Sequence, residues 1–475
     1  MSAPFVEETF DFPQPDGTFI AVRGTGDQYR ARFETLDGRP LVRNDAGFLV
    51  EAPRPAGLGF GPRSVQKPVE LVSELKVRDS RWEQRRKKTS RPRRRGLVAL
   101  DIASAPPSRP TVGTFVGLTL LIDFSDSPAT IPRSEVENFC NKPGYTGFGN
   151  NGSVFDYFRD VSGGKLLYTN VVAPYYRAKK PKSYYTNPAK PFGTRAQELI
   201  REALRHHIAK GFNFTALTAD GQSFIYALNV FYAGPRVNAW SQGLWPHQSS
   251  LASRVRLANG KTFADYQITD MGDQLTLGTF CHENGHMVCD FPDLYQYQGS
   301  GLGVGSYCLM CYGGNGANAK NPVHVGAYLK NESGWGAAVN ATAGATLSLA
   351  AGKNDFVIHQ RSATEYFILE NRQQQGRDVG LPGSGLAIWH IDETASNTKP
   401  PQPAHYECAL IQADGLGQLK SGGNYGDPGD LFSTATSPAF PSPPQVTGAW
   451  RNGSPSGLKI AQISAPGPMM SFRVT

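Results

Sequence analysis

The sequence predicts an α+β protein in which short strands outnumber helices. The chain of 475 residues contains 52 Gly and 35 Pro, a content typical of many turns and short strands. Helical spacing of apolar residues is confined to a few segments in the middle of the chain. Toward both ends, short apolar runs are separated by Gly, Asp, Asn and Pro. We therefore expect a β-rich N-terminal region, a mixed central domain and a β-sandwich-like C-terminal domain.

The first 110 residues divide into two segments. Residues 1–75 contain strand candidates such as Thr18 to Val22, with Asp/Gly turns between them. Residues 76–110 form a basic linker. From Lys76 to Arg95 there are 11 Lys/Arg against 2 acidic residues, a net +9, so the rest of the chain carries 8 − 9 = −1. This stretch has almost no apolar residues, which predicts disorder, and the protein as a whole has no basic face.

Residues 111–337 are the predicted central domain. Val116 to Phe124 is a buried-strand candidate, because it is an apolar run of strand length. Helical spacing and turn signals predict the remaining elements: helices over Ser153 to Asp160, Thr194 to Lys210 and Leu275 to Val288, a strand over Phe224 to Tyr232, and a hairpin over Val255 to Ile268 that turns at Asn259-Gly260.

Residues 338–475 read as a β-sandwich-like domain, because strand-like runs alternate with Gly, Pro and Asn turns. The predicted strands are Thr346 to Leu349, Phe356 to His359, Tyr366 to Glu370, Leu386 to Ile391 and Met470 to Val474.

The most informative motif lies in the last helix of the central domain. It is H-E-x-x-H, formed by His282, Glu283 and His286. Residues four apart lie on the same face of a helix, so two imidazoles can bind one Zn²⁺ there. The intervening glutamate is then placed to act as a general base toward a water molecule. The alternative interpretation is a surface helix that happens to carry two His and a Glu.

A catalytic zinc site usually has a third protein ligand. The sequence offers Asp290 and Asp293 shortly after the helix, on either side of Pro292, which cannot continue it. We favour Asp293, because a chain leaving the helix at Pro292 could bring this carboxylate back to the metal. Asp290 or a more distant residue stays open. Gly285 would allow another segment to pack closely against the helix.

The next motif surrounds Met310, which resembles the methionine turn found beneath some zinc sites. Tyr307 and Tyr312 are candidates to stabilise an oxyanion, although tyrosines at such positions are more often packing residues. Six cysteines are present (Cys140, Cys281, Cys289, Cys308, Cys311 and Cys408), and we expect disulfides that tie this loop to the helix. Free thiols, or a structural zinc site that includes Cys308 and Cys311, are the alternatives.

These motifs together resemble the immune-inhibitor-A-like family of secreted zinc metallopeptidases. The resemblance rests on residues 278–286, on Phe291 to Tyr295 and on Ser306 to Met310, and it extends over nearly the whole chain. Further segments that carry it include Leu121 to Asp126, Gly152 to Phe158, Glu365 to Arg372, Ile388 to Glu393, Gly426 to Phe432 and Gln14 to Thr18. One departure is that Cys289 stands where the family pattern has Gly, and Asp293 comes one residue late.

The resemblance implies a zinc-dependent endopeptidase that acts on proteins or peptides and is made as a zymogen. Residues 1 to about 95 would then be a propeptide, cleaved within Arg85 to Arg95, and a plain solvated linker is the alternative for this basic stretch. The implied catalytic fold is metzincin-like, a mixed sheet with the active-site helix below it. The strand Thr262 to Ile268 would be the edge strand that aligns substrate. The implied location is extracellular, although this sequence begins without a signal peptide.

Two other functions fit the motif. The chain could be an inactive binding or adhesion protein on a protease scaffold, or another zinc amide hydrolase, because H-E-x-x-H specifies water activation and not the acyl group attacked. No apolar run is long enough to span a membrane, and no motif supports nucleic-acid binding. We expect a monomer. The Asp/Gly-rich segment from Asp414 to Asp430 is a candidate Ca²⁺ site, and an ordinary turn-rich loop fits it equally well.

Overall fold

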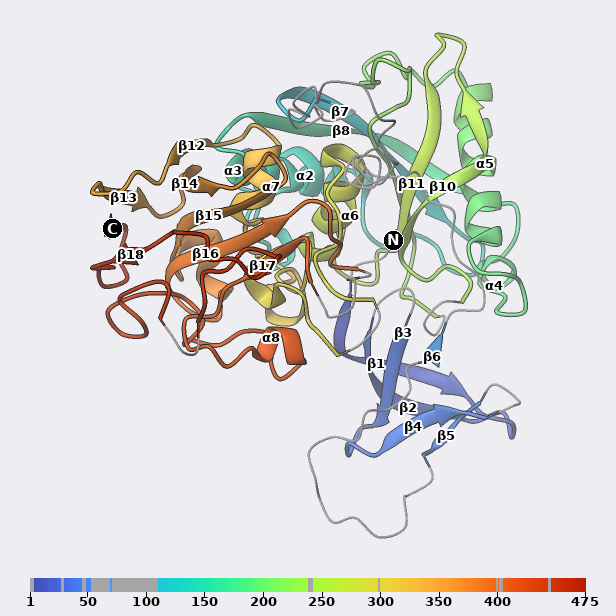
Figure 1. Ribbon diagram of the computed structural model, residues 1–475. Coiled ribbons are helices and arrows are strands. Elements are labelled where there is room, and N and C mark those ends of the chain that lie inside the picture. Colours follow the sequence, from blue (N-terminus) through green and yellow to red (C-terminus); the bar gives the residue numbers. More distant parts are fainter. Residues whose placement is uncertain are drawn as a thin grey trace, which may run out of the picture.

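The computed structural model of the protein describes residues 4–26, 30–44, 48–52, 69–70, 110–237, 242–297, 300–398, 400, 405–442 and 446–475 (Figure 1). The predicted basic linker, apart from Pro110, lies outside these ranges. The described residues form several sheets and few helices, in agreement with the predicted α+β class. No helix among them is long and apolar enough to cross a membrane.

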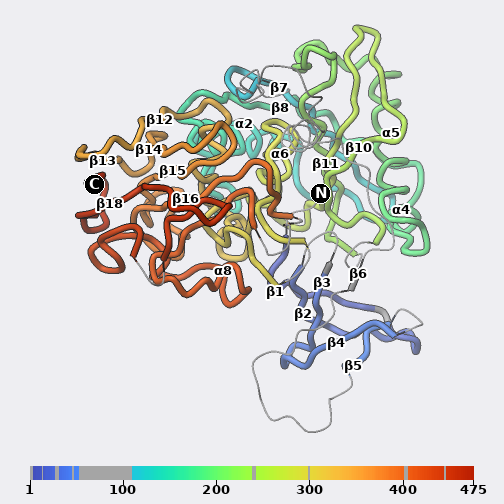
Figure 2. Tube along the Cα trace, in the orientation of Figure 1, coloured from blue at the N-terminus to red at the C-terminus, as the bar shows by residue number. Residues whose placement is uncertain are grey.

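The N-terminal sheet is a meander that projects from the rest of the molecule (Figure 2). Its order is β1-β2-β3-β4-β5, with β6 paired to β3. The turn after β3 contains Asp37 and Gly38 and has φ +86° at Gly38, a conformation that favours glycine. The strands are β1 (Phe5–Pro13), β2 (Phe19–Gly26), β3 (Arg30–Thr35), β4 (Pro40–Arg43), β5 (Leu49–Glu51) and β6 (Val69–Glu70).

This N-terminal module contacts the central domain through β1. The rings of Phe5 and Phe10 pack on Trp245, with centroids 5.5 and 5.4 Å away. Glu8 forms an ion pair with Arg236 at 2.7 Å, and the Arg236 guanidinium lies over the Trp245 ring. One small aromatic core, which also includes Phe192, therefore joins the module to the central domain.

The central domain is built on a five-stranded sheet of order β10-β11-β9-β7-β8. Four of the strands are parallel, and the edge strand β10 is antiparallel to β11. The predicted hairpin is confirmed, but Thr262 to Ile268 belongs to β11, which lies inside the sheet. The expectation that this segment is the edge strand is therefore wrong, because residues before Val255 add β10 outside it. The strands are β7 (Gly113–Asp123), β8 (Leu166–Arg177), β9 (Leu228–Tyr232), β10 (His247–Arg256) and β11 (Thr262–Asp270).

Helices cover both faces of this sheet. Helix α5 packs on one face with the even-numbered residues of β7 and β9, and α2, α3 and α6 pack on the other with odd-numbered residues such as Leu121 and Phe231. Ser153 caps α3 with a capping box to Asp156, as expected for a helix that starts there. The helices are α2 (Arg133–Asn141), α3 (Val154–Val161), α4 (Lys182–Tyr185), α5 (Thr194–Ala209), α6 (Leu277–Cys289), α7 (Ala327–Glu332) and α8 (Gln418–Ser421), with short 3₁₀ turns at 147–149, 305–307, 316–318 and 376–380.

The C-terminal region contains two sheets, of orders β12-β14-β15-β16-β17 and β13-β19-β18, with a shared apolar core between them. The other face of the larger sheet packs into the same core as α6, so α6 lies between the central sheet and the C-terminal sheet (Figure 1). The strands are β12 (Ala337–Asn340), β13 (Thr346–Ala350), β14 (Asp355–Gln360), β15 (Glu365–Arg372), β16 (Gly385–Asp392), β17 (Cys408–Leu410), β18 (Ile460–Ala461) and β19 (Met469–Val474).

Candidate metal centre

Helix α6 carries the H-E-x-x-H motif and ends in a sharp turn. The turn residue is Asp290, which adopts φ +59° and ψ +29°, the left-handed region. Its N–H donates to the carbonyl of His286, and the N–H of Phe291 donates to the carbonyl of Gly285. This is the usual way to satisfy the last carbonyls of a helix while reversing the chain. The reversal, followed by Pro292, carries Asp293 back over the helix.

Three predicted ligand atoms converge at this turn. Nε2 of His282 lies 3.2 Å from Nε2 of His286, and Oδ1 of Asp293 lies 3.1 Å and 3.2 Å from these two atoms. All three side chains are buried, with Asp293 only 1% exposed. Asp290 does not join this group. The structure therefore brings together His282, His286 and Asp293, the set that the sequence favours.

The protonation of the two imidazoles follows from their other nitrogen. Nδ1 of His282 lies 2.9 Å from the carbonyl of Leu309, and Nδ1 of His286 lies 2.6 Å from the carbonyl of Phe291. A carbonyl only accepts, so each Nδ1 carries the proton and each Nε2 of a neutral imidazole presents a lone pair. Two lone pairs and a carboxylate oxygen then face one another in a buried space. This donor set fits a divalent transition metal, and two histidines with a carboxylate are one of the sets that hold catalytic Zn²⁺.

The acid–base properties of the site reflect its burial and its pairing. Burial alone would lower the pKa of His282, but the adjacent Asp293 outweighs this effect and raises it. Burial alone would raise the pKa of Asp293, but His286 and His282 hold it well below the usual range. Burial raises the pKa of Glu283, which is 1% exposed and adjacent to His282 in the motif. A carboxylate whose proton affinity is raised in this way suits a general base.

Tyr297 is a site residue that the sequence reasoning missed. Its hydroxyl donates to Oδ2 of Asp293 at 2.5 Å, which leaves Oδ1 directed at the two imidazoles. Hydrogen bonds of this kind orient a carboxylate toward a metal. A tyrosine four residues after a candidate carboxylate was visible in the sequence, but only the fold of the loop shows that it turns back.

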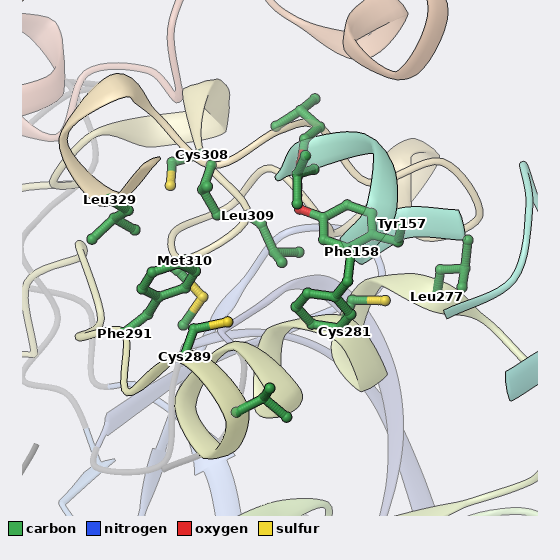
Figure 3. Packing of buried hydrophobic residues seen from close by; sticks show 14 of the residues in the cluster. Tyr157, Phe158, Leu277, Cys281, Cys289, Phe291, Cys308, Leu309, Met310 and Leu329 are labelled. Atoms are coloured by element: carbon green, nitrogen blue, oxygen red, sulfur yellow. The ribbon is translucent and has the colours of Figure 1, made fainter. Parts of the chain in front are cut away.

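Met310 packs against α6 (Figure 3) and lies close to Gly285, the small residue that the sequence places on this helix. A side chain at position 285 would begin 2.7 Å from the Met310 sulfur and 3.4 Å from the Phe291 ring. Gly285 therefore allows the methionine to approach the helix backbone between the two histidines. Leu309, the neighbour of Met310, supplies the carbonyl that holds His282. The turn thus both supports the helix and orients one predicted ligand.

The two candidate oxyanion tyrosines have different contacts. The Tyr307 hydroxyl donates to Asp430 at 3.1 Å and lies 3.0 Å from the Asp427 carbonyl, so it is directed into the C-terminal region. The Tyr312 ring packs edge-to-face on Tyr425 and is tilted against Tyr295. The interpretation of Tyr307 as an oxyanion donor is therefore wrong, because its hydroxyl is engaged by the C-terminal region. The oxyanion role of Tyr312 stays a prediction.

The cysteines do not form the expected disulfides. All six lie among the described residues, all six are buried, and none of them forms a disulfide. Cys281 and Cys289 are eight residues apart on one helix, about 12 Å along its axis, so they cannot bond to each other. Cys311 donates its thiol hydrogen to the carbonyl of Leu302. Within the described ranges, no group of potential metal ligands contains a cysteine, so the structural-zinc alternative has no support either.

A second group of carboxylates forms in the predicted Ca²⁺ segment. Asp414, Asp427 and Asp430 bring oxygens within 4.8 Å of one another. Protein donors already contact this group, including Asn424 on Asp427 at 2.7 Å and the Asp427 N–H on Asp430 at 2.9 Å. Burial raises the pKa of Asp430. The Ca²⁺ site stays a prediction.

Comparison with known proteins adds no identification. No protein-family model matches the chain, and no curated protein matches it. The function must therefore be argued from the site.

Proposed function

We propose that the chain is a zinc-dependent endopeptidase that hydrolyses peptide bonds of proteins and is made as a zymogen. One observation carries the proposal: Nε2 of His282, Nε2 of His286 and Oδ1 of Asp293 converge within 3.2 Å, next to the buried Glu283. Both imidazoles are fixed by backbone carbonyls, which makes their lone pairs available to a metal. Two histidines and one carboxylate are a common ligand set of catalytic zinc.

Each residue has a separate part in the proposed reaction. Zn²⁺ held by His282, His286 and Asp293 would polarise the substrate carbonyl and lower the pKa of a water molecule. Glu283 accepts a proton from the attacking water on its carboxylate and passes it to the leaving amine. Tyr297 keeps the Asp293 carboxylate oriented. Met310 keeps the loop that holds His282 against the helix.

The arrangement of elements supports a metzincin-like catalytic domain. A mixed sheet carries an antiparallel edge strand, β10, and α6 lies on one face of the sheet. The unusual spacing after His286 has a simple geometric basis. Helix α6 runs through Cys289, and the left-handed residue is Asp290, one position later than the Gly of the family pattern. In the family pattern the aspartate follows the Gly by three positions, and in this chain Asp293 follows Asp290 by three positions. The turn and the third ligand are therefore displaced together by one residue.

The burial of the site supports the zymogen part of the proposal. His282 and Glu283 are 2% and 1% exposed in the full chain, so a polypeptide substrate could contact them only after part of the structure moves. The N-terminal module docks through Phe5 and Glu8 onto the loop that precedes β10. We propose that cleavage within Arg85 to Arg95 releases this module and allows a substrate to reach the candidate site.

The proposal is tested with the full chain, first for metal content and then for proteolysis. Metal analysis should find one Zn²⁺ per chain. Limited digestion by a trypsin-like protease, followed by its inhibition, should yield an enzyme that degrades casein. Glu283→Gln should lower casein hydrolysis by about 10²–10⁴-fold. Glu137→Gln, a change on the exposed face of α2, is the matched control and should leave hydrolysis unchanged.

The outcomes separate the three functions. Casein degradation that Glu283→Gln and a chelator both abolish supports the endopeptidase. Bound zinc without hydrolysis of any protein, after complete cleavage of the linker, favours a binding protein. Hydrolysis limited to small amides favours another zinc amide hydrolase. A chain that binds no zinc would overturn the proposal.

A further inference from the structure

A buried network of polar side chains connects α6 to the central sheet. It runs through residues that are all less than 7% exposed, in a layer that is otherwise apolar. Burying amides and hydroxyls is costly unless every group finds a partner. We call this set the amide network; its members are Thr119 on β7, Tyr168 and Asn170 on β8, Asn229 on β9, Gln267 on β11 and Asn284 on α6.

Asn229 is the centre of the amide network. Its Nδ2 donates to Oδ1 of Asn170 at 2.9 Å and to the Tyr168 hydroxyl at 3.1 Å. Its Oδ1 accepts from Gln267 and from Asn284, both at 3.0 Å. An asparagine amide offers two donor hydrogens and two acceptor sites, so every one of them is used. The orientation of this side chain is therefore fully determined.

Asn284 is the residue of α6 that is hydrogen-bonded to the rest of the amide network. Its Oδ1 accepts from the Tyr168 hydroxyl at 2.7 Å, and its Nδ2 donates to Asn229 and to the carbonyl of Phe280 at 2.8 Å. It directly follows Glu283 in the H-E-x-x-H motif. At about 100° per residue, Asn284 lies about 200° around the helix from His282. The helix thus presents the network side chain to the sheet and the ligands to the metal centre.

The sheet register explains why these groups meet. Thr119 pairs with Asn229 across β7 and β9, and Asn229 pairs with Gln267 across β9 and β11. Paired residues point to the same face, here the face on which α6 packs. Strands buried on both faces are normally apolar throughout. The row of polar residues therefore places directional contacts where apolar packing alone would serve stability.

We propose that the amide network is a positioning device for the reaction, in which Asn284 and Asn229 fix the rotation of α6 about its axis. This inference rests on the proposed function. Apolar contacts tolerate small rotations of a helix, whereas the bonds of Asn284 to two different strands do not. A rotation of α6 would move His282, Glu283 and His286 together, away from Asp293 on the separate loop. Asn284 and Asn229 are positioning residues and do not touch the reacting atoms.

The test removes the hydrogen bonds of Asn284 and keeps the volume of its side chain similar. Asn284→Leu should lower kcat by about 10–100-fold with KM within about twofold, because small misplacements of catalytic groups have effects of this size. Zn²⁺ affinity, measured by competition with a chromogenic chelator, should fall about tenfold. The visible absorption spectrum of the Co²⁺-substituted protein should shift. Tyr168→Phe removes a single hydroxyl, preserves folding, and should change kcat and the Co²⁺ spectrum in the same direction with smaller size.

The matched control is Asn371→Leu in the C-terminal region. Asn371 is also buried and makes three hydrogen bonds, to the carbonyls of Leu349 and Gly467 and from Gln373. Its replacement should lower the unfolding midpoint about as much as Asn284→Leu, but leave kcat, Zn²⁺ affinity and the Co²⁺ spectrum unchanged. The double variant Tyr168→Phe/Asn284→Leu should have the kcat of Asn284→Leu alone, since both changes break one connection.

The possible results separate the inference from the function on which it rests. If the wild type binds metal and cleaves protein, and both Asn284→Leu and Tyr168→Phe keep its kcat and Co²⁺ spectrum, the positioning role is wrong and the network only stabilises the fold. Equal effects of Asn284→Leu and Asn371→Leu on kcat lead to the same conclusion. A wild type that binds neither Zn²⁺ nor Co²⁺ overturns the proposed function itself.

Discussion

Two buried polar regions flank the candidate metal centre, and they differ in chemistry. The amide network is neutral and attaches α6 to the central sheet. The second region, here the charged cluster, consists of Lys330, Glu370, Arg372 and Asp378. Arg372 donates to Asp378 at 2.8 Å and 3.0 Å, and to the carbonyl of Tyr307 at 3.1 Å. The charged cluster thus attaches the loop of Met310 to the C-terminal sheet.

The helix and the loop that form the candidate metal centre are held by different parts of the chain. His282 and His286 lie on a helix that the amide network holds. The carbonyl that orients His282 lies on a loop that the charged cluster holds. A neutral amide that loses a partner costs about 1–3 kcal/mol, and a buried charge left unpaired costs about 3–5 kcal/mol. Substitutions in the charged cluster, which holds the loop, should therefore lower the free energy of unfolding more than substitutions in the amide network, which holds the helix.

The largest expected effect comes from breaking the charged cluster. Arg372→Met should lower the free energy of unfolding by about 3–5 kcal/mol, because it leaves Asp378 and Glu370 buried without their guanidinium. Urea unfolding measures the change. Arg361→Met is the control: it removes an ion pair of similar length to Glu365, but at a partly exposed position. That change should cost about 1 kcal/mol or less. Equal losses for the two variants would contradict the argument from burial.

Acidification should weaken the charged cluster and leave the amide network intact. Burial alone would raise the pKa of Asp378, but Arg372 outweighs this effect and holds it well below the usual range. The stabilisation is therefore complete above the unfolded pKa of about 4 and is lost as the pH falls below it, with a size on the order of 2 kcal/mol. The difference in urea midpoint between wild type and Asp378→Asn should narrow from pH 5 to pH 3.

The difference in urea midpoint between wild type and Tyr168→Phe should behave differently. Burial keeps the pKa of the Tyr168 phenol well above its usual value, so this group stays protonated over the same range. The midpoint difference should then be constant between pH 5 and pH 3. Parallel narrowing in both variants would mean that the acid effect is global and does not arise in the charged cluster.

The contact of Gly285 with Met310 joins helix α6 to the loop that the charged cluster holds. Gly285→Ala places a methyl group 2.7 Å from the Met310 sulfur, closer than van der Waals contact allows. Overpacking of this kind should lower the free energy of unfolding by about 1–3 kcal/mol. Because the methionine side chain is the obstacle, Gly285→Ala/Met310→Ala should be less destabilised than the sum of the two single variants. Additive losses in thermal or urea unfolding would show that the clash is relieved elsewhere.

The smallest expected effect concerns the orientation of Asp293. Tyr297→Phe removes the hydroxyl that donates to Oδ2 of Asp293 and preserves the ring. Zn²⁺ affinity should fall about tenfold, equivalent to about 1.4 kcal/mol, with little change in urea midpoint. Competition with a chromogenic chelator measures it. Tyr295→Phe, a change on the neighbouring ring, serves as the control, and equal losses in both variants would remove the special role of Tyr297.

Much of this architecture was predictable because local patterns specify it. The apolar spacing from Thr194 onward gave the helix α5, and Asn259-Gly260 gave the hairpin turn that the structure contains. The boundaries moved where local signals are weak: β9 begins at Leu228, four residues later than expected, and α6 extends one residue further to Cys289. The amide network left a trace in the sequence as single polar residues within apolar runs, such as Asn229.

Other features depend on contacts between distant segments and could not be read locally. Tyr307 was equally compatible with the metal centre and with the C-terminal region, and only packing directs it to Asp430. The cysteines around α6 suggested disulfides, yet each thiol is buried separately. The predicted boundary at residue 338 is crossed by one continuous core, since Phe356 and Trp389 pack in the same cluster as α6.

The sequence by itself determined the chemistry of the candidate site. H-E-x-x-H fixes two imidazoles and a carboxylate on one helix, because a helix repeats every 3.6 residues whatever surrounds it. The tertiary structure decided which carboxylate completes the set. Asp290 and Asp293 have the same side chain, so residue type does not distinguish them. The left-handed turn places Asp290 in the backbone reversal and returns Asp293 to the histidines. That choice rests on a turn whose geometry is stabilised by the loop of Met310, which is held by residues far away in the chain.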